Sequence, residues 1–244
     1  MVRRDADRMK HEFLSHATRE EAVDFAARMA AGVLEAAIAD SGRASFLVSG
    51  GSTPVPLFDR LANKELAWGR VTVGLVDERW VSPVDAGSNE RLVRHHLLTG
   101  RAGAAGFVPM KTDAPTASDA VADRGMAYKP HCDPIDLIVL GMGNDGHTAS
   151  WFPGSKGLRD AMQAEEDRVV AAIDATGCPV AGSMPHRLTL TGSAIIDSDA
   201  AILLLFGVEK REVFEAALKS DPAEKPIRFA VDGLGPRLTV IWAP

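Results

Sequence analysis

Residues 135–154 read IDLIVLGMGNDGHTASWFPG, a short apolar run followed at once by a polar loop rich in glycine. An apolar run of this length is typical of a strand that is buried on both faces of a sheet. The loop, residues 141–154, contains four glycines, one aspartate and one histidine. Glycines allow a backbone to turn sharply and to approach a ligand closely. The stretch therefore predicts a buried strand with a ligand-binding loop at its carboxyl end.

The same alternation of strand and helix extends in both directions along the chain. Further strands are expected at residues 45–49, 71–76, 169–173, 201–206 and 238–242. Helices are expected from a capping box at Thr18 and Glu21 to about Gly42, and at about 54–63, 89–98, 117–128 and 208–219. Continuous apolar strands separated by helices indicate a mostly parallel sheet covered by helices on both faces. We expect a single α/β domain spanning residues 1–244.

The composition narrows the class of protein. A net charge of −6 disfavours nucleic acid as the main partner, because binding its phosphates needs a surplus of clustered Lys and Arg. Cys132 and Cys178 are far apart and the histidines show no metal-ligand spacing, so no metal site is expected. No apolar run approaches the roughly 18 residues of a membrane span, and residues 1–11 lack the apolar core of a signal peptide. We expect a cytoplasmic protein that binds a small molecule. The sequence leaves its oligomeric state open and is compatible with a monomer.

Three polar clusters directly follow predicted strands, where ligands bind in open parallel sheets. The first is SGGSTP at residues 49–54. Gly50 and Gly51 permit a sharp turn, and Ser52 and Thr53 place hydroxyl and N–H groups at the start of a helix, which favours an anion. The cluster therefore predicts a phosphate-binding loop. It equally fits an ordinary tight turn in which Ser or Thr caps the helix.

Other polar residues could complete a site with this loop. Asp77 and Arg79 follow the strand at 71–76, and the planar guanidinium of Arg79 suits a phosphate or a carboxylate. Arg187 lies in the alternating segment HRLTLT, in which the leucines are expected to pack inward. Lys210 begins a helix after the strand at 201–206 and could neutralise a phosphate. Each alone has an ordinary alternative: Arg79 could pair with a neighbouring carboxylate in a surface loop, and Lys210 could be a solvated lysine.

His147 is the strongest catalytic candidate. An imidazole titrates near neutral pH and can act as a general base. Asp145, two residues earlier, can orient the imidazole or stabilise its charged form. A lone histidine is more often structural, but its setting in a glycine-rich loop after a buried strand favours catalysis.

The motifs SGGSTP, DERWV with SN downstream, LGMGNDGHTASWFPG, PHRLTLT and FGVEK, in this order, resemble the 6-phosphogluconolactonase family. The resemblance covers nearly the whole chain. It implies a NagB-like, modified Rossmann fold and hydrolysis of 6-phospho-D-glucono-1,5-lactone to 6-phospho-D-gluconate, the second step of the oxidative pentose phosphate pathway. It implies no metal and no organic cofactor.

Residue by residue, the resemblance makes His147 the base that activates water, helped by Asp145 and with Arg187 as the favoured stabiliser of the oxyanion. It makes Gly50, Gly51, Ser52 and Thr53 a phosphate loop, and places Asp77, Arg79, Arg187 and Lys210 in the site. Which of the three cations binds the phosphate stays open. Trp151 departs from the family pattern, which often has a smaller aliphatic residue there, and is expected to affect packing only.

Three other interpretations fit these residues less well. Glucosamine-6-phosphate deaminase resembles this chain in its GxDGHxA loop, but its pattern has an acidic residue where this chain has Phe152 and a Tyr where it has Arg79. A non-catalytic sugar-phosphate sensor predicts a fused DNA-binding segment and a decayed histidine site, and both Asp145 and His147 are present. A purely structural protein leaves the polar clusters at strand ends unexplained.

Overall fold

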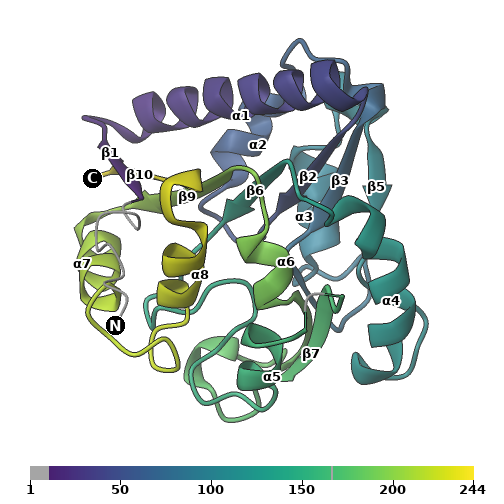
Figure 1. Cartoon of the computed structure of the whole chain (residues 1–244), viewed down its shortest axis with the longest axis vertical. Helices are drawn as coiled ribbons and strands as arrows, with labels where there is room; N and C mark the ends of the chain where they lie inside the picture. The colour runs from purple at the N-terminus through teal and green to yellow at the C-terminus, as the bar shows by residue number, and fades with distance from the viewer. Residues whose placement is uncertain (1–10, 166) are drawn as a thin grey trace, which may run out of the picture.

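The computed structural model describes residues 11–165 and 167–244. Residues 1–10 lie outside the described residues. They make up most of the stretch 1–11, in which the sequence predicts no signal peptide. Within the described part, seven strands form one sheet in the order β1-β10-β9-β6-β2-β3-β5, and every neighbouring pair is parallel (Figure 1). The strands are β1 (Glu12–Ser15), β2 (Ala44–Val48), β3 (Val71–Leu75), β5 (Gly106–Val108), β6 (Leu137–Leu140), β9 (Ala201–Phe206) and β10 (Leu238–Ala243). The predicted parallel sheet is confirmed.

Helices cover both faces of this sheet, as predicted. The helices α1 (Arg19–Ser41) and α2 (Val55–Ala62) lie on one face, and α6 (Gly192–Ile196), α7 (Val208–Ala217) and α8 (Ile227–Leu234) lie on the other (Figure 1). The remaining helices are α3 (Asn89–His96), α4 (Val121–Tyr128) and α5 (Leu158–Met162). Short 3-10 turns occur at Trp68–Arg70, Gly100–Ala104, Ser118–Ala120, Lys129–His131, Pro179–Ala181 and Gly235–Arg237.

The first helix begins and ends where the sequence predicts. Thr18 Oγ1 accepts a hydrogen bond from the Glu21 backbone N–H at 3.2 Å, and the Glu21 carboxylate accepts one from the Thr18 N–H at 3.3 Å. This reciprocal pair satisfies N–H groups that the first turn leaves without partners. Gly42 closes the helix in the left-handed conformation with φ of 79°.

A second, smaller sheet departs from the prediction. The strands β4 (Asp77–Arg79), β8 (His186–Leu190) and β7 (Val170–Asp174) pair antiparallel in that order. The strand expected at residues 169–173 therefore exists, but it is not part of the parallel sheet. The connection from β7 to β8 is too short to carry the helical crossover that parallel pairing requires. The small sheet joins the large one through the Leu190 N–H, which donates to Val76 O at 2.8 Å.

The strand order reverses between β2 and β6. From β2 the chain proceeds outward to β3 and β5, and then returns to the other side of β2 as β6 before continuing to β9 and β10. Loops that leave the carboxyl ends of strands on either side of such a reversal separate and leave a crevice. Here those loops are residues 49–54 and 141–154. The fold thus brings together the two glycine-rich segments singled out from the sequence.

The core is continuous. The buried apolar side chains of the large sheet, its helices and the small sheet form one cluster. Trp151 is fully buried in it, and its indole N–H donates to Leu190 O at 3.0 Å. Its role in packing is as expected. Among the described residues, no helix is both long and apolar enough to cross a bilayer.

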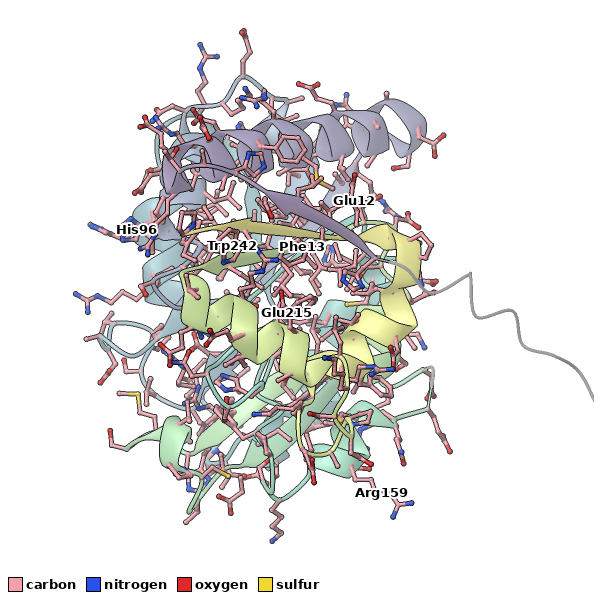
Figure 2. All side chains as sticks on the ribbon, turned by 90° about the vertical axis from the view of Figure 1, so that its left-hand side faces the viewer. Glu12, Phe13, His96, Arg159, Glu215 and Trp242 are labelled. Carbon is pink, nitrogen blue, oxygen red and sulfur yellow. The ribbon has the colours of Figure 1, made fainter. Side chains whose placement is uncertain are left out.

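Side-chain contacts stabilise the edge of the large sheet that is formed by β1. Phe13 of β1 and Trp242 of β10 lie close together beside α7 (Figure 2). The Arg211 guanidinium of α7 lies 5.6 Å from the centre of the Phe13 ring and 5.1 Å from that of Trp242, and it pairs with Glu215 at 2.8 Å. Cation–π contacts of this kind add a modest stabilisation. They hold β1 against β10.

Candidate active site

A cavity of about 290 Å³ opens where the strand order reverses. Its wall contains most of the side chains predicted from the sequence. The lining residues are Ser49, Gly50, Gly51, Ser52, Thr53, Pro54, Asp77, Arg79, Asn89, Gly141, Met142, Gly143, His147, Ala149, Phe152, Val180 and Arg187. Asp145 and Lys210 are the two predicted residues that are not in this wall.

His147 and Asp145 form a hydrogen-bonded pair at the cavity. His147 Nδ1 lies 2.6 Å from Asp145 Oδ1, and the His147 backbone N–H donates to the same oxygen at 3.2 Å. Partial burial tends to raise the pKa of Asp145, but the hydrogen bonds and charge of His147 outweigh it and leave that pKa below its usual value. Asp145 is therefore a carboxylate at neutral pH. Since Nδ1 faces Asp145, Nε2 is the ring nitrogen left for a ligand or a water.

The loop around this pair has room only for glycine at position 143. A Cβ placed on Gly143 would lie 2.2 Å from His147 Nδ1 and 2.5 Å from Asp145 Oδ1. Both distances are far below van der Waals contact. The absence of a side chain at Gly143 is what allows the His147–Asp145 pair to form.

Phe152 lies between His147 and Arg187 and contacts both. Its buried ring lies 4.4 Å from the His147 ring between centroids, tilted by 36°, and the Arg187 guanidinium lies 5.3 Å from the centre of the same ring. An apolar ring in this position excludes water from one side of the imidazole. It also places no charge there.

Arg79 and Arg187 are register partners in the adjacent strands β4 and β8. Their side chains therefore lie side by side on the same face of the small sheet. Arg187 is 5% exposed; its Nε donates to Met184 O at 2.6 Å and its Nη2 to Ala181 O at 3.2 Å. Burial lowers the pKa of Arg187, the neighbouring Asp77 opposes this, and Arg79 adds to it. Like charges that face each other across a sheet repel. The pair thus creates a positive field that suits an anion.

Backbone carbonyls accept hydrogen bonds from the guanidinium groups of both Arg79 and Arg187. Arg79 donates to Gly87 O, while its Nε is buried and has no partner in the described part of the chain. The nearest carboxylate to Arg187 is Asp77, whose Oδ2 lies 4.0 Å from Nη1. Within residues 11–165 and 167–244, neither guanidinium is neutralised by a close, bidentate carboxylate. Arg79 is therefore not the surface ion pair that its sequence context alone allowed.

The adjacent acids Asp77 and Glu78 have different surroundings. Asp77 Oδ2 accepts a hydrogen bond from Ser150 Oγ at 2.6 Å, and Oδ1 accepts one from Asn89 Nδ2 at 3.3 Å. Glu78 points away from the cavity and accepts hydrogen bonds from the groups at the start of α3: Ser88 Oγ at 2.9 Å and the backbone N–H groups of Asn89 and Glu90 at 2.8 Å each. Burial raises the pKa of Glu78 although these hydrogen bonds oppose it. Glu78 therefore anchors a helix.

The loop at residues 49–54 turns tightly along the cavity wall. Gly51 has φ of 89°, and a Cβ on Gly50 would lie 1.9 Å from Asn89 Oδ1, so both positions require glycine. Of the described groups, no side chain caps the start of α2, so Ser52 and Thr53 are not the capping residues of the alternative reading. Sequence reasoning did not assign Asn89 or Ser150 to the site. The SN motif downstream of DERWV contains Asn89 and could have indicated its place in the site.

Lys210 lies behind the histidine loop. Its ammonium donates to Met142 O at 2.5 Å. Burial lowers the pKa of Lys210, and Asp145 and Glu209 oppose that change. Among residues 11–165 and 167–244, no three His, Cys, Asp or Glu side chains cluster as metal ligands would.

Comparisons with known proteins agree with this arrangement. The family described as glucosamine-6-phosphate isomerases/6-phosphogluconolactonase matches residues 17–240. A 6-phosphogluconolactonase of Xylella fastidiosa is 46% identical over 206 residues, which cover 84% of this chain and 84% of that protein. One from Rhizobium meliloti is 44% identical over 212 residues, 86% of this chain and 89% of that protein. A crystal structure of a 6-phosphogluconolactonase from Shewanella baltica superposes with a TM-score of 0.91 at 37% identity, covering 97% of this chain and 99% of that one. The resemblance drawn from the motifs is confirmed.

Proposed function

We propose that this chain, which belongs to the family of glucosamine-6-phosphate isomerases and 6-phosphogluconolactonases, is itself a 6-phosphogluconolactonase. Its substrate is 6-phospho-D-glucono-1,5-lactone and its product is 6-phospho-D-gluconate, in the second step of the oxidative pentose phosphate pathway. Relatives of that name at 46%, 44% and 37% identity support this choice of reaction. The proposal places the reaction in one domain, in the cytoplasm, and requires no metal or organic cofactor.

The observation that carries the mechanism is the His147–Asp145 pair at the cavity wall. Because the Asp145 carboxylate accepts the proton of Nδ1–H, the lone pair of His147 remains on Nε2. Nε2 removes a proton from a water molecule while the water oxygen bonds to the lactone carbonyl carbon. The tetrahedral intermediate then breaks its bond to the ring oxygen, which receives the proton back from Nε2. One water is added and His147 is regenerated.

The charges around the cavity suit the two anionic parts of this reaction. Arg187 stabilises the oxyanion in this proposal, and its contact with Phe152, whose ring also contacts the His147 ring, supports that role. The N–H and hydroxyl groups of residues 50–53 and the Arg79 guanidinium bind the phosphate. Lys210, behind the histidine loop, adds positive charge near the cavity. Under this assignment Arg187→Met lowers kcat, whereas Arg79→Met raises KM. The reverse pattern would exchange the two roles.

The test generates the lactone in situ with glucose-6-phosphate dehydrogenase and follows its disappearance against spontaneous hydrolysis. The wild-type protein should accelerate the loss, and a folded His147→Ala protein should lose roughly 10²–10⁴-fold in kcat, the usual contribution of a general base. Full activity of folded His147→Ala would exclude the mechanism. Release of ammonia from glucosamine 6-phosphate, with no lactone hydrolysis, would instead assign the chain to the other activity of its family.

A further inference from the structure

Lys225 contacts the histidine loop from a part of the chain that no catalytic motif includes. It lies in the connection between α7 and α8, in the sequence DPAEKPIR at residues 221–228. Its ammonium donates a hydrogen bond to Asp145 O at 2.9 Å. Asp145 O is the backbone carbonyl of the residue whose carboxylate holds His147 Nδ1. Lys225 therefore contacts one member of the His147–Asp145 pair directly, through its backbone carbonyl.

The contact is supported by packing and by a second hydrogen bond. Gly146 has φ of 85°, and a Cβ placed on it would lie 2.4 Å from Lys225 Cδ, so the methylenes of Lys225 lie directly against this glycine. Two residues later the Ile227 N–H donates to Gly146 O at 3.0 Å. The segment at residues 225–227 thus fixes the backbone carbonyls of Asp145 and Gly146, the two residues that precede His147. Such a contact restricts the peptide groups on either side of the Asp145 side chain.

Several charged groups surround the His147–Asp145 pair, and they come from different elements. Lys225 lies at Asp145 O, and Lys210 with Glu209 lies at the start of α7 near Met142 and Asn144. Arg187 approaches from β8 through Phe152, and the Cys178 thiol lies near enough for the Asp145 charge to affect it. Three of these groups are cations. Each of these cations adds positive potential near the pair.

We propose that Lys225 is a positioning residue of the hydrolase: its ammonium fixes the backbone of Asp145 and, through that carboxylate, the orientation and basicity of His147. The inference rests on the function proposed above. Lys225 does not line the cavity, so it acts on the base and not on the substrate.

The experiment compares Lys225→Met, Lys225→Arg and Lys219→Met. Methionine keeps the packing of the methylenes against Gly146 but removes the donor and the charge, and arginine restores both. Lys219 is an exposed lysine on the same segment, and its replacement makes the same change in net charge. The pH dependence of kcat/KM is measured on the in-situ lactone at low ionic strength, with spontaneous hydrolysis subtracted. Urea unfolding checks each protein.

Lys225→Met is expected to lower kcat about 10-fold, because a catalytic group that moves by a fraction of an ångström loses part of its effective concentration. KM should change less than twofold. The midpoint of the acid limb should move upward by about 0.5 pH units, since a nearby positive charge that opposed protonation has been removed. Lys225→Arg should restore both values, and Lys219→Met should match the wild type.

Two outcomes would overturn the inference. One is a folded Lys225→Met protein whose kcat and acid limb match those of Lys219→Met. The other is a loss of activity that appears only in KM. Were Lys225→Met to unfold, Lys225→Arg decides alone: an acid limb displaced from that of the wild type would contradict the proposal, and an unchanged limb supports it. If the wild-type protein does not accelerate lactone loss, the proposed function fails, and if folded His147→Ala retains full activity, the proposed mechanism fails. Both results are distinguishable from either outcome at Lys225.

Discussion

Replacing Gly143 by alanine should disable the site without removing any functional group. The added Cβ would lie 2.2 Å from His147 Nδ1 and 2.5 Å from Asp145 Oδ1, where contact distances of about 3.4 Å or more are needed. The imidazole must therefore move by about 1 Å. The 2.6 Å hydrogen bond between the two side chains cannot survive this movement, because the methyl group occupies the space beside both atoms.

The expected magnitude follows from that displacement. A misplacement of about 1 Å costs on the order of 10²-fold in rate, and complete loss of the general base costs up to about 10⁴-fold. We expect kcat of Gly143→Ala to fall within these limits. Gly141→Ala is the matched control, because no atom lies within 4 Å of a Cβ at that position of the same loop. Its kcat should stay within a few-fold of the wild type, and its KM reports any contact with the substrate.

The assay is the initial rate of lactone loss, with circular dichroism and urea unfolding to show that both variants fold. Overpacking at Gly143 should lower the free energy of unfolding by about 1–3 kcal/mol, too little to unfold a protein of this size. A folded Gly143→Ala protein with kcat within threefold of the wild type would refute the reasoning. It would mean that the His147–Asp145 contact does not determine the rate.

Three further predictions concern other residues of the site. Asp145→Asn should lower kcat by about 10²–10⁴-fold by favouring the wrong imidazole tautomer. The pKa of Asp145 is lowered in the folded protein, so its carboxylate stabilises the fold above the unfolded pKa of about 3.9. This contribution disappears as the pH falls through the folded pKa. The difference in urea stability between the wild type and Asp145→Asn should therefore close progressively as the pH falls below about 4. Arg79→Met should raise KM about 10–100-fold, yet leave the melting temperature of the free protein unchanged or higher, because it relieves the repulsion with Arg187; a clear fall in calorimetry would contradict this. Glu78→Gln should lower the free energy of unfolding by about 1–3 kcal/mol, since three donors at the start of α3 lose their carboxylate, and an unchanged urea midpoint would argue against that role.

The large sheet was predictable because its central strands consist of apolar residues in continuous runs. The run at residues 135–140 contains β6 and the run at 201–206 matches β9, since strands buried on both faces need apolar side chains throughout. The strands β1 and β5 were not predicted. They lie at the edges, are only four and three residues long, and carry no comparable pattern. The assignment of residues 169–173 to the wrong sheet has a different cause: an apolar run says that a strand is buried, but not which strand is its partner.

The site was predictable residue by residue but not as an arrangement. Strand ends and glycine spacing pointed to His147, Arg79 and the loop at 50–53. That Arg79 faces Arg187 depends on the pairing of β4 with β8, segments about 110 residues apart in sequence that pair over three residues. The separate roles of Asp77 and Glu78 follow from the side of a strand to which each points. Lys225 carried no signal, because a lysine before a proline in a polar connection is ordinary in sequence.

The placement of β10 between β1 and β9 has a consequence for how the protein is made. The strand at residues 12–15 leaves the ribosome more than 220 residues before strand β10, its only partner in the sheet of the described chain. Until β10 emerges, β1 has no hydrogen-bonding neighbour in this sheet, and Arg211 cannot link Phe13 to Trp242. Pairing over such a separation is slow to form and leaves an open edge in the meantime. The half of the sheet that contains β2, β3 and β5 can assemble early, whereas the edge at β1 closes last. Nascent chains of this protein should therefore be most prone to aggregation, and most dependent on chaperones, in the interval just before synthesis of β10.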